Sequence, residues 1–436
     1  MCDVSQDAIF TNVFKFIEWI VQVAATTSSV LPQQPQKTPE NRKKLSKEIF
    51  CFYESWAEGR EGDGSFSLYD FKPELCTTAV YMLALLDGDI LKPNNPWLEL
   101  SDNGGQNLYG RFNDMKIQYP NMRTVMAIGG WVEGSEKYSK LAASSIKRKK
   151  FAQNAADFLK KYGFDGIHFH WEHPAHRGGI PEDKQNFVHL LKEVHDVFKP
   201  QNLFISAFLR TQSNVLEKAY DVKNIAKFVD AIAMMTFDYG GPWNKKVEFH
   251  APMKSNDENN VESRVNHFMQ LGVPAEKIIL GIPFFGRTFI TSNDGNIGDK
   301  AKDQGFDGPF VKEGGFLGYN EFCRLRKEHE WSVSYDSKSS QSIGKFRKDG
   351  ITYVVTFDSP RSVANKVKFA VKKNLGGVWV FFVDTGEKFN FYLEWLIKFN
   401  FQMISAVNVT WIQQHLQILQ NHHHQESKRT FRYSEQ

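Results

Sequence analysis

The sequence predicts one large (β/α)8 barrel with an α+β subdomain inserted between its last two strands. Two observations carry this prediction. From Lys47 onward, eight apolar, β-branched runs alternate with helical stretches, a pattern typical of a parallel barrel whose strands are buried on both faces. The chain has 436 residues and is 41% hydrophobic, so it can bury a large core, and one barrel-sized domain would use most of it.

The candidate strands follow one another with room for a helix between them. They are Ile49–Ser55, Ala79–Leu86, Thr124–Gly129, Gly166–Glu172, Leu203–Leu209, Ala231–Asp238, Ile278–Phe285 and Val378–Asp384. The gap between the seventh and eighth strands, about residues 287–352, is longer than one crossover needs. We expect the inserted subdomain there, within a barrel that spans residues 47–402.

The two ends of the chain do not fit the barrel pattern. Residues 1–46 are apolar only in patches, lack a basic start and end in a proline-rich linker, so they make a poor signal peptide. Residues 403–436 are expected to form a disordered tail. The 54 basic and 50 acidic residues nearly balance, which gives no reason to expect a nucleic-acid or membrane partner.

The stretch Phe164–Pro174 brings several polar side chains to one place. Side chains change face at each step of a strand, so His168, His170 and Glu172 are predicted to share one side, about 6.5–7 Å apart. Three ionisable groups on a buried face cost too much desolvation free energy to be packing residues alone. We therefore expect a polar ligand to be met there.

Further polar and aromatic residues follow the predicted strands, at the barrel end where such proteins carry their chemistry. Glu172 closes the fourth strand and Asp238 the sixth, and the other candidates that follow strands are Trp56, Trp131 and Arg287. Each alone has a structural explanation as a cap, an ion-pair partner or a core residue. Their agreement across five strands favours a functional site.

The stretch Phe164–Pro174 resembles the signature DGxDxDxE of the family 18 glycoside hydrolases, the chitinases. Asp165, Gly166 and Glu172 match its first Asp, its Gly and its Glu, whereas His168 and His170 stand where the family has its second and third Asp. The resemblance implies the barrel fold, secretion, a monomer and a mechanism without a cofactor or metal.

Other motifs of the family recur in order along residues 47–390. They are Cys51–Trp56, Ala127–Trp131, Met235–Asp238 with Trp243 after it, Gly281–Phe289, and Leu375–Gly377 before the last strand. The resemblance implies that Trp56, Trp131 and Trp243 stack on sugar rings.

The departures from the family bear on catalysis. In the family, the third Asp of the signature stabilises the cationic intermediate formed by the sugar's own N-acetyl group; a neutral imidazole at His170 brings no negative charge. The sixth- and seventh-strand Tyr are Phe237 and Phe285, and the eighth-strand Trp aligns with Phe381, with Trp379 two positions earlier. The resemblance implies that these three phenylalanines belong to the carbohydrate-binding site.

The resemblance and its departures together imply a catalytically silent, chitinase-like lectin. We expect it to bind chitin or N-acetylglucosamine oligomers through its tryptophans, with Asp238 and Arg287 as hydrogen-bonding residues. Arthropods carry such proteins, and those of mites, known as allergens, are the expected closest group.

Three alternatives remain open. One is a weakly active chitinase that uses Glu172 as general acid. Another is a zinc-dependent hydrolase in which His168 and His170 hold the metal with Glu172 or Asp238. The third is a barrel that binds no sugar and serves as a signalling scaffold.

Four cysteines are too few for a fold built on disulfides. Cys51 and Cys76 fall at the starts of two consecutive predicted strands, and the resemblance implies that they pair. Cys323 matches a family cysteine but has no partner downstream, so we expect it to be free and buried. This usage favours an oxidising compartment.

Overall fold

Eight parallel strands form a closed barrel in the structure, a computed structural model that describes residues 47–386. The closure is made by β1, which pairs with β14 on one side and with β2 on the other. The barrel strands, in spatial order, are β1 (Glu48–Glu54), β2 (Thr78–Asp87), β4 (Arg123–Gly129), β5 (Gly166–His170), β6 (Phe204–Arg210), β7 (Ala231–Met235), β8 (Ile278–Pro283) and β14 (Gly377–Phe381). The predicted (β/α)8 fold is confirmed.

Five strands end earlier than the sequence pattern indicated. The first and seventh end at Glu54 and Pro283, where we expected Ser55 and Phe285. We expected the fourth, sixth and eighth to reach Glu172, Asp238 and Asp384, but they end at His170, Met235 and Phe381. The backbone explains these ends. β5 loses its neighbour because β4 stops at Gly129, its last partner, and Asp238 and Phe382 have φ values of 58° and 61°, which turn the chain out of the sheet.

The barrel interior is filled with aromatic and aliphatic side chains. Trp379 is fully buried at its centre, where its indole N–H donates to the carbonyl of Met234 at 2.9 Å. The rings of Phe52, Phe208 and Phe237 pack around it, with centroid distances between 4.9 and 5.8 Å.

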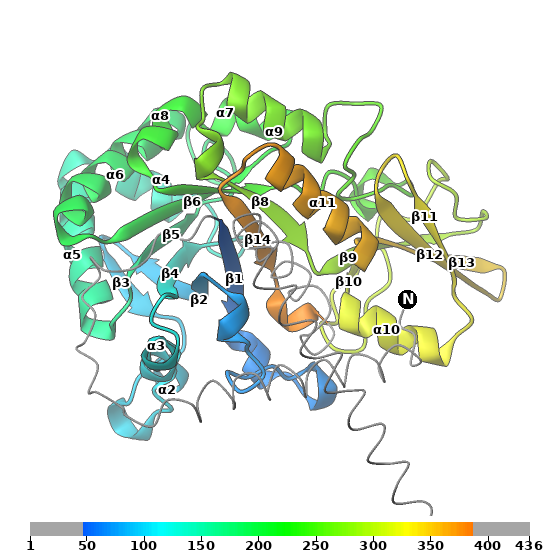
Figure 1. The fold of residues 1–436 in the computed structure, drawn as a ribbon, viewed down its shortest axis with the longest axis horizontal. Helices are drawn as coiled ribbons and strands as arrows, with labels where there is room; N and C mark the ends of the chain where they lie inside the picture. The colour runs from blue at the N-terminus through cyan, green and yellow to red at the C-terminus, as the bar shows by residue number, and fades with distance from the viewer. Residues whose placement is uncertain (1–46, 387–436) are drawn as a thin grey trace, which may run out of the picture. The chain divides into compact units, whose positions relative to one another are not determined.

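Helices cover the outside of the barrel, and Figure 1 shows α5, α6 and α8 along one side of it. The helices are α2 (Pro96–Glu99), α3 (Leu108–Gln118), α4 (Glu136–Ala143), α5 (Ser145–Tyr162), α6 (Asp183–Phe198), α7 (Ser213–Ala219), α8 (Val222–Phe228), α9 (Val261–Gln270), α10 (Tyr319–Glu328) and α11 (Pro360–Lys372). The longest, α5, begins where Ser144 caps the backbone N–H of Lys147 and ends at Gly163, whose φ of 80° suits glycine.

A second sheet lies between β8 and β14 in the sequence, next to the barrel in Figure 1. Its antiparallel strands, in spatial order, are β10 (Phe316–Gly318), β9 (Phe285–Thr291), β13 (Ile351–Phe357), β12 (Gln341–Lys348) and β11 (Ser332–Asp336). Together with α10 they form an α+β subdomain slightly wider than the expected 287–352. A further short strand, β3 (Ile90–Pro93), pairs antiparallel with β2 at the barrel edge.

The cysteines agree with the sequence analysis at two positions and differ at a third. Cys51 and Cys76 form a disulfide, as the resemblance implied. Cys323 is buried in α10 but is not free, because its sulfur also belongs to a disulfide. The expectation was wrong because it considered only downstream partners.

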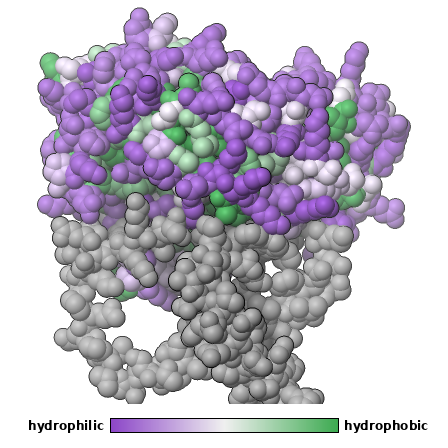
Figure 2. Space-filling model, turned by 45° about the horizontal axis from the view of Figure 1, so that its top comes forward, coloured by the Kyte–Doolittle hydropathy of each residue, from purple (hydrophilic) through white to green (hydrophobic). Residues whose placement is uncertain are grey.

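Most of the described surface in Figure 2 is hydrophilic, with apolar residues gathered in a few patches. Within residues 47–386, none of the helices is both long enough and apolar enough to cross a membrane. The predicted N-terminal extension (residues 1–46) and the tail (403–436) lie outside the described residues.

A buried ion pair joins the inserted sheet to α11. Lys366 and Asp358 contact each other with both side chains fully buried, and Gln341 of β12 donates a hydrogen bond of 3.0 Å to Asp358. Removing one partner of such a pair leaves an uncompensated charge in a medium of low polarity.

We therefore predict that Asp358→Ala lowers the free energy of unfolding by about 3–5 kcal/mol, measured by urea denaturation. The matched control is Asp294→Ala, which removes an exposed partner of Arg347 and should cost at most about 1 kcal/mol. Equal losses in the two variants would contradict this assignment.

Candidate functional site

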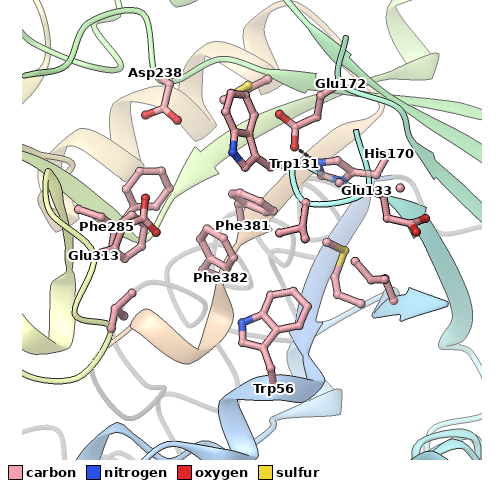
Figure 3. A pocket seen from close by; sticks show the side chains of 18 of the residues that line it. Trp56, Trp131, Glu133, His170, Glu172, Asp238, Phe285, Glu313, Phe381 and Phe382 are labelled. Carbon is pink, nitrogen blue, oxygen red and sulfur yellow. Dashed lines mark ion pairs between the residues drawn. The ribbon is translucent and has the colours of Figure 1, made fainter. Parts of the chain in front are cut away.

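A cleft of about 1050 Å³ lies at the carboxyl ends of the barrel strands. Residues that end or follow seven of the eight strands line it, and the loop between β9 and β10 adds Val311 and Glu313. Figure 3 shows Glu172, Asp238 and Phe285 around the opening, with Phe381 near its middle and Trp56 on one side. This is the barrel end at which the sequence analysis placed the site.

Glu172 lies in the cleft between a histidine and an arginine. Its Oε1 is 3.5 Å from Nε2 of His170, and its Oε2 accepts a hydrogen bond of 3.2 Å from Arg210 (Figure 3 shows the first of these contacts). Burial alone would raise the pKa of the Glu172 carboxyl, but the hydrogen bond and charge of His170, together with Arg210, outweigh it and hold the pKa below its ordinary value. Glu172 is therefore a carboxylate at neutral pH.

His168 and His170 point to the same side of β5, as the alternation predicted, but only His170 lines the cleft. His168 lies deeper, with Nδ1 2.8 Å from the hydroxyl of Ser206. Its pKa is well below the ordinary value, mainly because the ring is buried and to a smaller extent because of the charge of His170. The His170 ring stacks on Phe208 with a centroid distance of 4.0 Å. Nδ1 of His170 is buried and has no hydrogen-bond partner among the described residues.

Asp165 is far from these groups along the strand. It precedes β5, at the amino end of the barrel, whereas the cleft lies at the carboxyl end. Its carboxylate accepts the backbone N–H of Thr124 at 2.8 Å and the ammonium of Lys116 at 3.1 Å. These contacts give Asp165 a structural role, and we withdraw it from the candidate catalytic residues.

Asp238 and Arg287 form a second charged group on the cleft wall. Two guanidinium nitrogens of Arg287 donate to the two carboxylate oxygens of Asp238, each at 2.7 Å. Burial opposes ionisation of Asp238, but the charge and hydrogen bonds of Arg287, with His250 at 3.7 Å, hold its pKa well below the ordinary range. The guanidinium carbon also lies 5.2 Å from the ring centroid of Trp243.

The three predicted sugar-stacking tryptophans all line the cleft and are accessible. Trp56, Trp131 and Trp243 are 41%, 56% and 49% exposed. The Arg177 guanidinium carbon lies 3.8 Å from the ring centroid of Trp131 and its Nη1 donates to the Trp131 carbonyl at 2.6 Å, which fixes that ring at the rim. Such large exposed apolar rings indicate a binding surface.

The cleft floor is apolar. Phe285 and Phe381 line it as predicted, but Phe237 does not, because it is fully buried beneath Phe381, with a centroid distance of 5.6 Å. Phe237 was placed by its match to the family's sixth-strand Tyr, and in the structure its ring packs into the barrel core against Trp379 at a centroid distance of 5.4 Å.

The sequence analysis missed several cleft residues. Arg210 ends β6, so the rule that found Glu172 and Asp238 could have found it as well. Phe208, on the same strand, and Phe382, after β14, also line the cleft and were not among the candidates. Glu133 and Glu313 come from loops, where a single sequence carries no positional signal.

The zinc alternative finds no support in this geometry. Within the described part of the chain, no group of three or more His, Cys, Asp or Glu side chains is placed to hold a metal ion. The expected third ligands, Glu172 and Asp238, are each paired with an arginine.

The chain is a (β/α)8 barrel whose cleft, at the carboxyl ends of the strands, is lined by aromatic rings and carboxylates. This arrangement is typical of barrels that bind or cleave sugars. The model of the family "Glycosyl hydrolases family 18" matches residues 48–386. The chain belongs to this family.

Relatives and solved structures agree with this family assignment. The chain is 36% identical over 377 residues to "Probable chitinase 2" of Drosophila melanogaster, a match that covers 84% of this chain and 77% of the relative. It resembles the crystal structure of the Ostrinia furnacalis Group IV chitinase with a TM-score of 0.75 and 30% identity, over 81% of this chain and 99% of the other. Human YKL-39 shares the fold, with a TM-score of 0.70 and 23% identity, over 82% of this chain and 100% of the other.

The Asp238–Arg287 pair yields a prediction about stability and pH. A carboxyl group whose pKa is depressed by folding stabilises the fold above its unfolded pKa of about 3.9, and this contribution is lost as the pH falls towards the folded value. Arg287→Met removes the main cause of the depression and leaves the burial that raises the pKa, so Asp238 binds a proton at a higher pH in the variant than in the unmodified protein. We expect the substitution to cost about 3–5 kcal/mol near pH 7, and clearly less near about pH 3.5, by urea denaturation.

The control for this prediction is Arg287→Lys, which keeps the charge but loses the bidentate hydrogen bond to Asp238. Near neutral pH it should lower the free energy of unfolding by less than Arg287→Met does. A loss from Arg287→Met that stays constant across this pH range would contradict the assigned role.

Proposed function

We propose that the chain binds chitin or N-acetylglucosamine oligomers in its cleft without hydrolysing them, as a chitinase-like lectin. The observation that carries the proposal is the imidazole of His170 beside Glu172. The family mechanism needs a carboxylate in that place, to accept the acetamido N–H of the sugar and to balance the positive charge of the intermediate. An imidazole supplies no negative charge, and its protonated form would repel that cation.

The charge state of Glu172 supports the same conclusion. A general acid must carry a proton at the working pH, which in buried carboxylic acids requires a raised pKa. Here the pKa is instead below its ordinary value, because His170 and Arg210 outweigh burial. The carboxylate is held as an ion-pair partner and is poorly suited to protonate a glycosidic oxygen.

Binding does not require the missing groups. Pyranose rings present C–H faces that stack on aromatic side chains, and three exposed tryptophans line the cleft. Relatives of the same fold provide precedent: an Ostrinia furnacalis Group IV chitinase is described in complex with allosamidin, and human YKL-39 as a pseudo-chitinase with retained chitooligosaccharide binding.

We also propose that the protein acts outside the cell, as a monomer. The Cys51–Cys76 disulfide supports an oxidising compartment, because cytosolic thiols are kept reduced.

The binding proposal predicts that chitotetraose binds, and that Trp56→Ala, Trp131→Ala and Trp243→Ala each weaken it. Loss of one stacking contact should raise Kd roughly two- to tenfold by isothermal titration. The matched control is Trp97→Ala, which removes an exposed tryptophan outside the cleft and should leave Kd unchanged. Absence of binding heat at millimolar chitotetraose would instead favour the signalling scaffold.

The catalytic proposal predicts that His170→Asp increases the release of fluorophore from a chito-oligosaccharide glycoside. Restoring one electrostatic stabiliser can raise the rate by up to about 10²–10³, and the gain should vanish in His170→Asp/Glu172→Gln. His170→Asn, similar in size to the aspartate but neutral, should give no gain. Substantial turnover by the unmodified protein that disappears in Glu172→Gln would establish the weakly active chitinase instead.

A further inference from the structure

The floor of the cleft is lined by apolar side chains from several strands. Six of them are Phe208, Met235, Phe285, Phe316, Phe381 and Phe382. Phe285 stacks on Phe316 at a centroid distance of 4.5 Å, and Phe381 lies 3.9 Å from Phe382. Figure 3 shows Phe285, Phe381 and Phe382 as neighbours across the cleft. We call the surface formed by these six side chains the apolar floor.

Two carboxylates beside the apolar floor are already paired. Asp238 is held by Arg287, and Glu172 by Arg210 and His170. The indole N–H of Trp379, beneath the floor, donates to Met234. His170 Nδ1 has no hydrogen-bond partner within residues 47–386, but it is buried and its ring lies flat on Phe208.

An acetamido group placed on this floor would therefore meet few hydrogen-bond partners. Its N–H and C=O would give up water without a replacement, which disfavours binding. An alkyl chain carries no such penalty, and each methylene removed from water tightens binding by about fourfold when fully buried.

We propose that the apolar floor accepts an alkyl chain attached to a chito-oligosaccharide, so that the preferred ligand is amphiphilic. The tryptophans at the rim hold the sugar rings and the floor holds the chain. This inference rests on the proposed sugar binding and narrows its ligand class. The chain could be joined as an N-acyl group longer than acetyl or through the glycosidic oxygen.

The test is an isothermal titration series with chitotetraose derivatives. One arm lengthens the N-acyl group from acetyl to propanoyl, butanoyl and hexanoyl; the other compares the methyl, butyl and hexyl β-glycosides. We expect Kd to fall by up to about fourfold per methylene in one arm, which also identifies the attachment. Similar gains in both arms support the floor as well, since either link can then deliver the chain.

Two kinds of variant locate the effect. Phe381→Ser and Phe382→Ser remove apolar area from the floor. In these variants, each added methylene should lower Kd by a factor close to one; two positions are used in case one variant fails to fold. Trp56→Ala, at the rim, should weaken every ligand by the same factor and leave the gain per methylene intact.

The outcomes separate this inference from the proposed function. If chitotetraose binds but affinity does not change with chain length in either arm, the inference is overturned and the lectin proposal stands. A gain that persists in both floor variants also overturns it, because the chain then binds elsewhere. If no derivative binds, both proposals fail.

Discussion

The closure of the barrel by β1 is the constraint on which the site depends. Because β1 pairs in parallel with both β14 and β2, all eight carboxyl ends form one ring. Side chains as distant in sequence as Trp56 and Phe381 then face a common cleft. The buried core around Trp379 supports that ring from below, so the floor and the walls of the cleft are set by the packing of the barrel itself.

Within the cleft, two carboxylate–arginine pairs lie beside an apolar floor. Glu172 with Arg210, and Asp238 with Arg287, neutralise each other at distances of 2.7 to 3.2 Å. Groups paired in this way hold the walls in place but are less available to stabilise new charge on a substrate, because any such contact must compete with an arginine. This pairing supports the proposed function, in which the cleft holds a ligand and does not stabilise a charged intermediate.

The fold and most of the cleft could be predicted from periodicity and from the residues that follow the strands. Two aromatic rings were placed wrongly or missed: Phe237, matched to the family's sixth-strand Tyr, lies beneath Phe381, and Phe382, which follows β14 with a φ of 61°, lines the cleft. Asp165 was misplaced because a motif match was given more weight than its position before the strand. The partnership of Arg210 with Glu172 joins two strands, and no local pattern records such a contact.

The retention of Glu172 does not by itself imply catalysis. Without that carboxylate, the largely buried guanidinium of Arg210 would keep, among the hydrogen bonds within residues 47–386, one of 3.3 Å to Gln212. Leaving a largely buried charge without its counter-ion is costly, so structural selection alone can preserve the glutamate. The proposed function makes the neighbour, His170, the residue that separates binding from hydrolysis, because changing it alters the charge available to a substrate while Glu172 keeps its arginine partner.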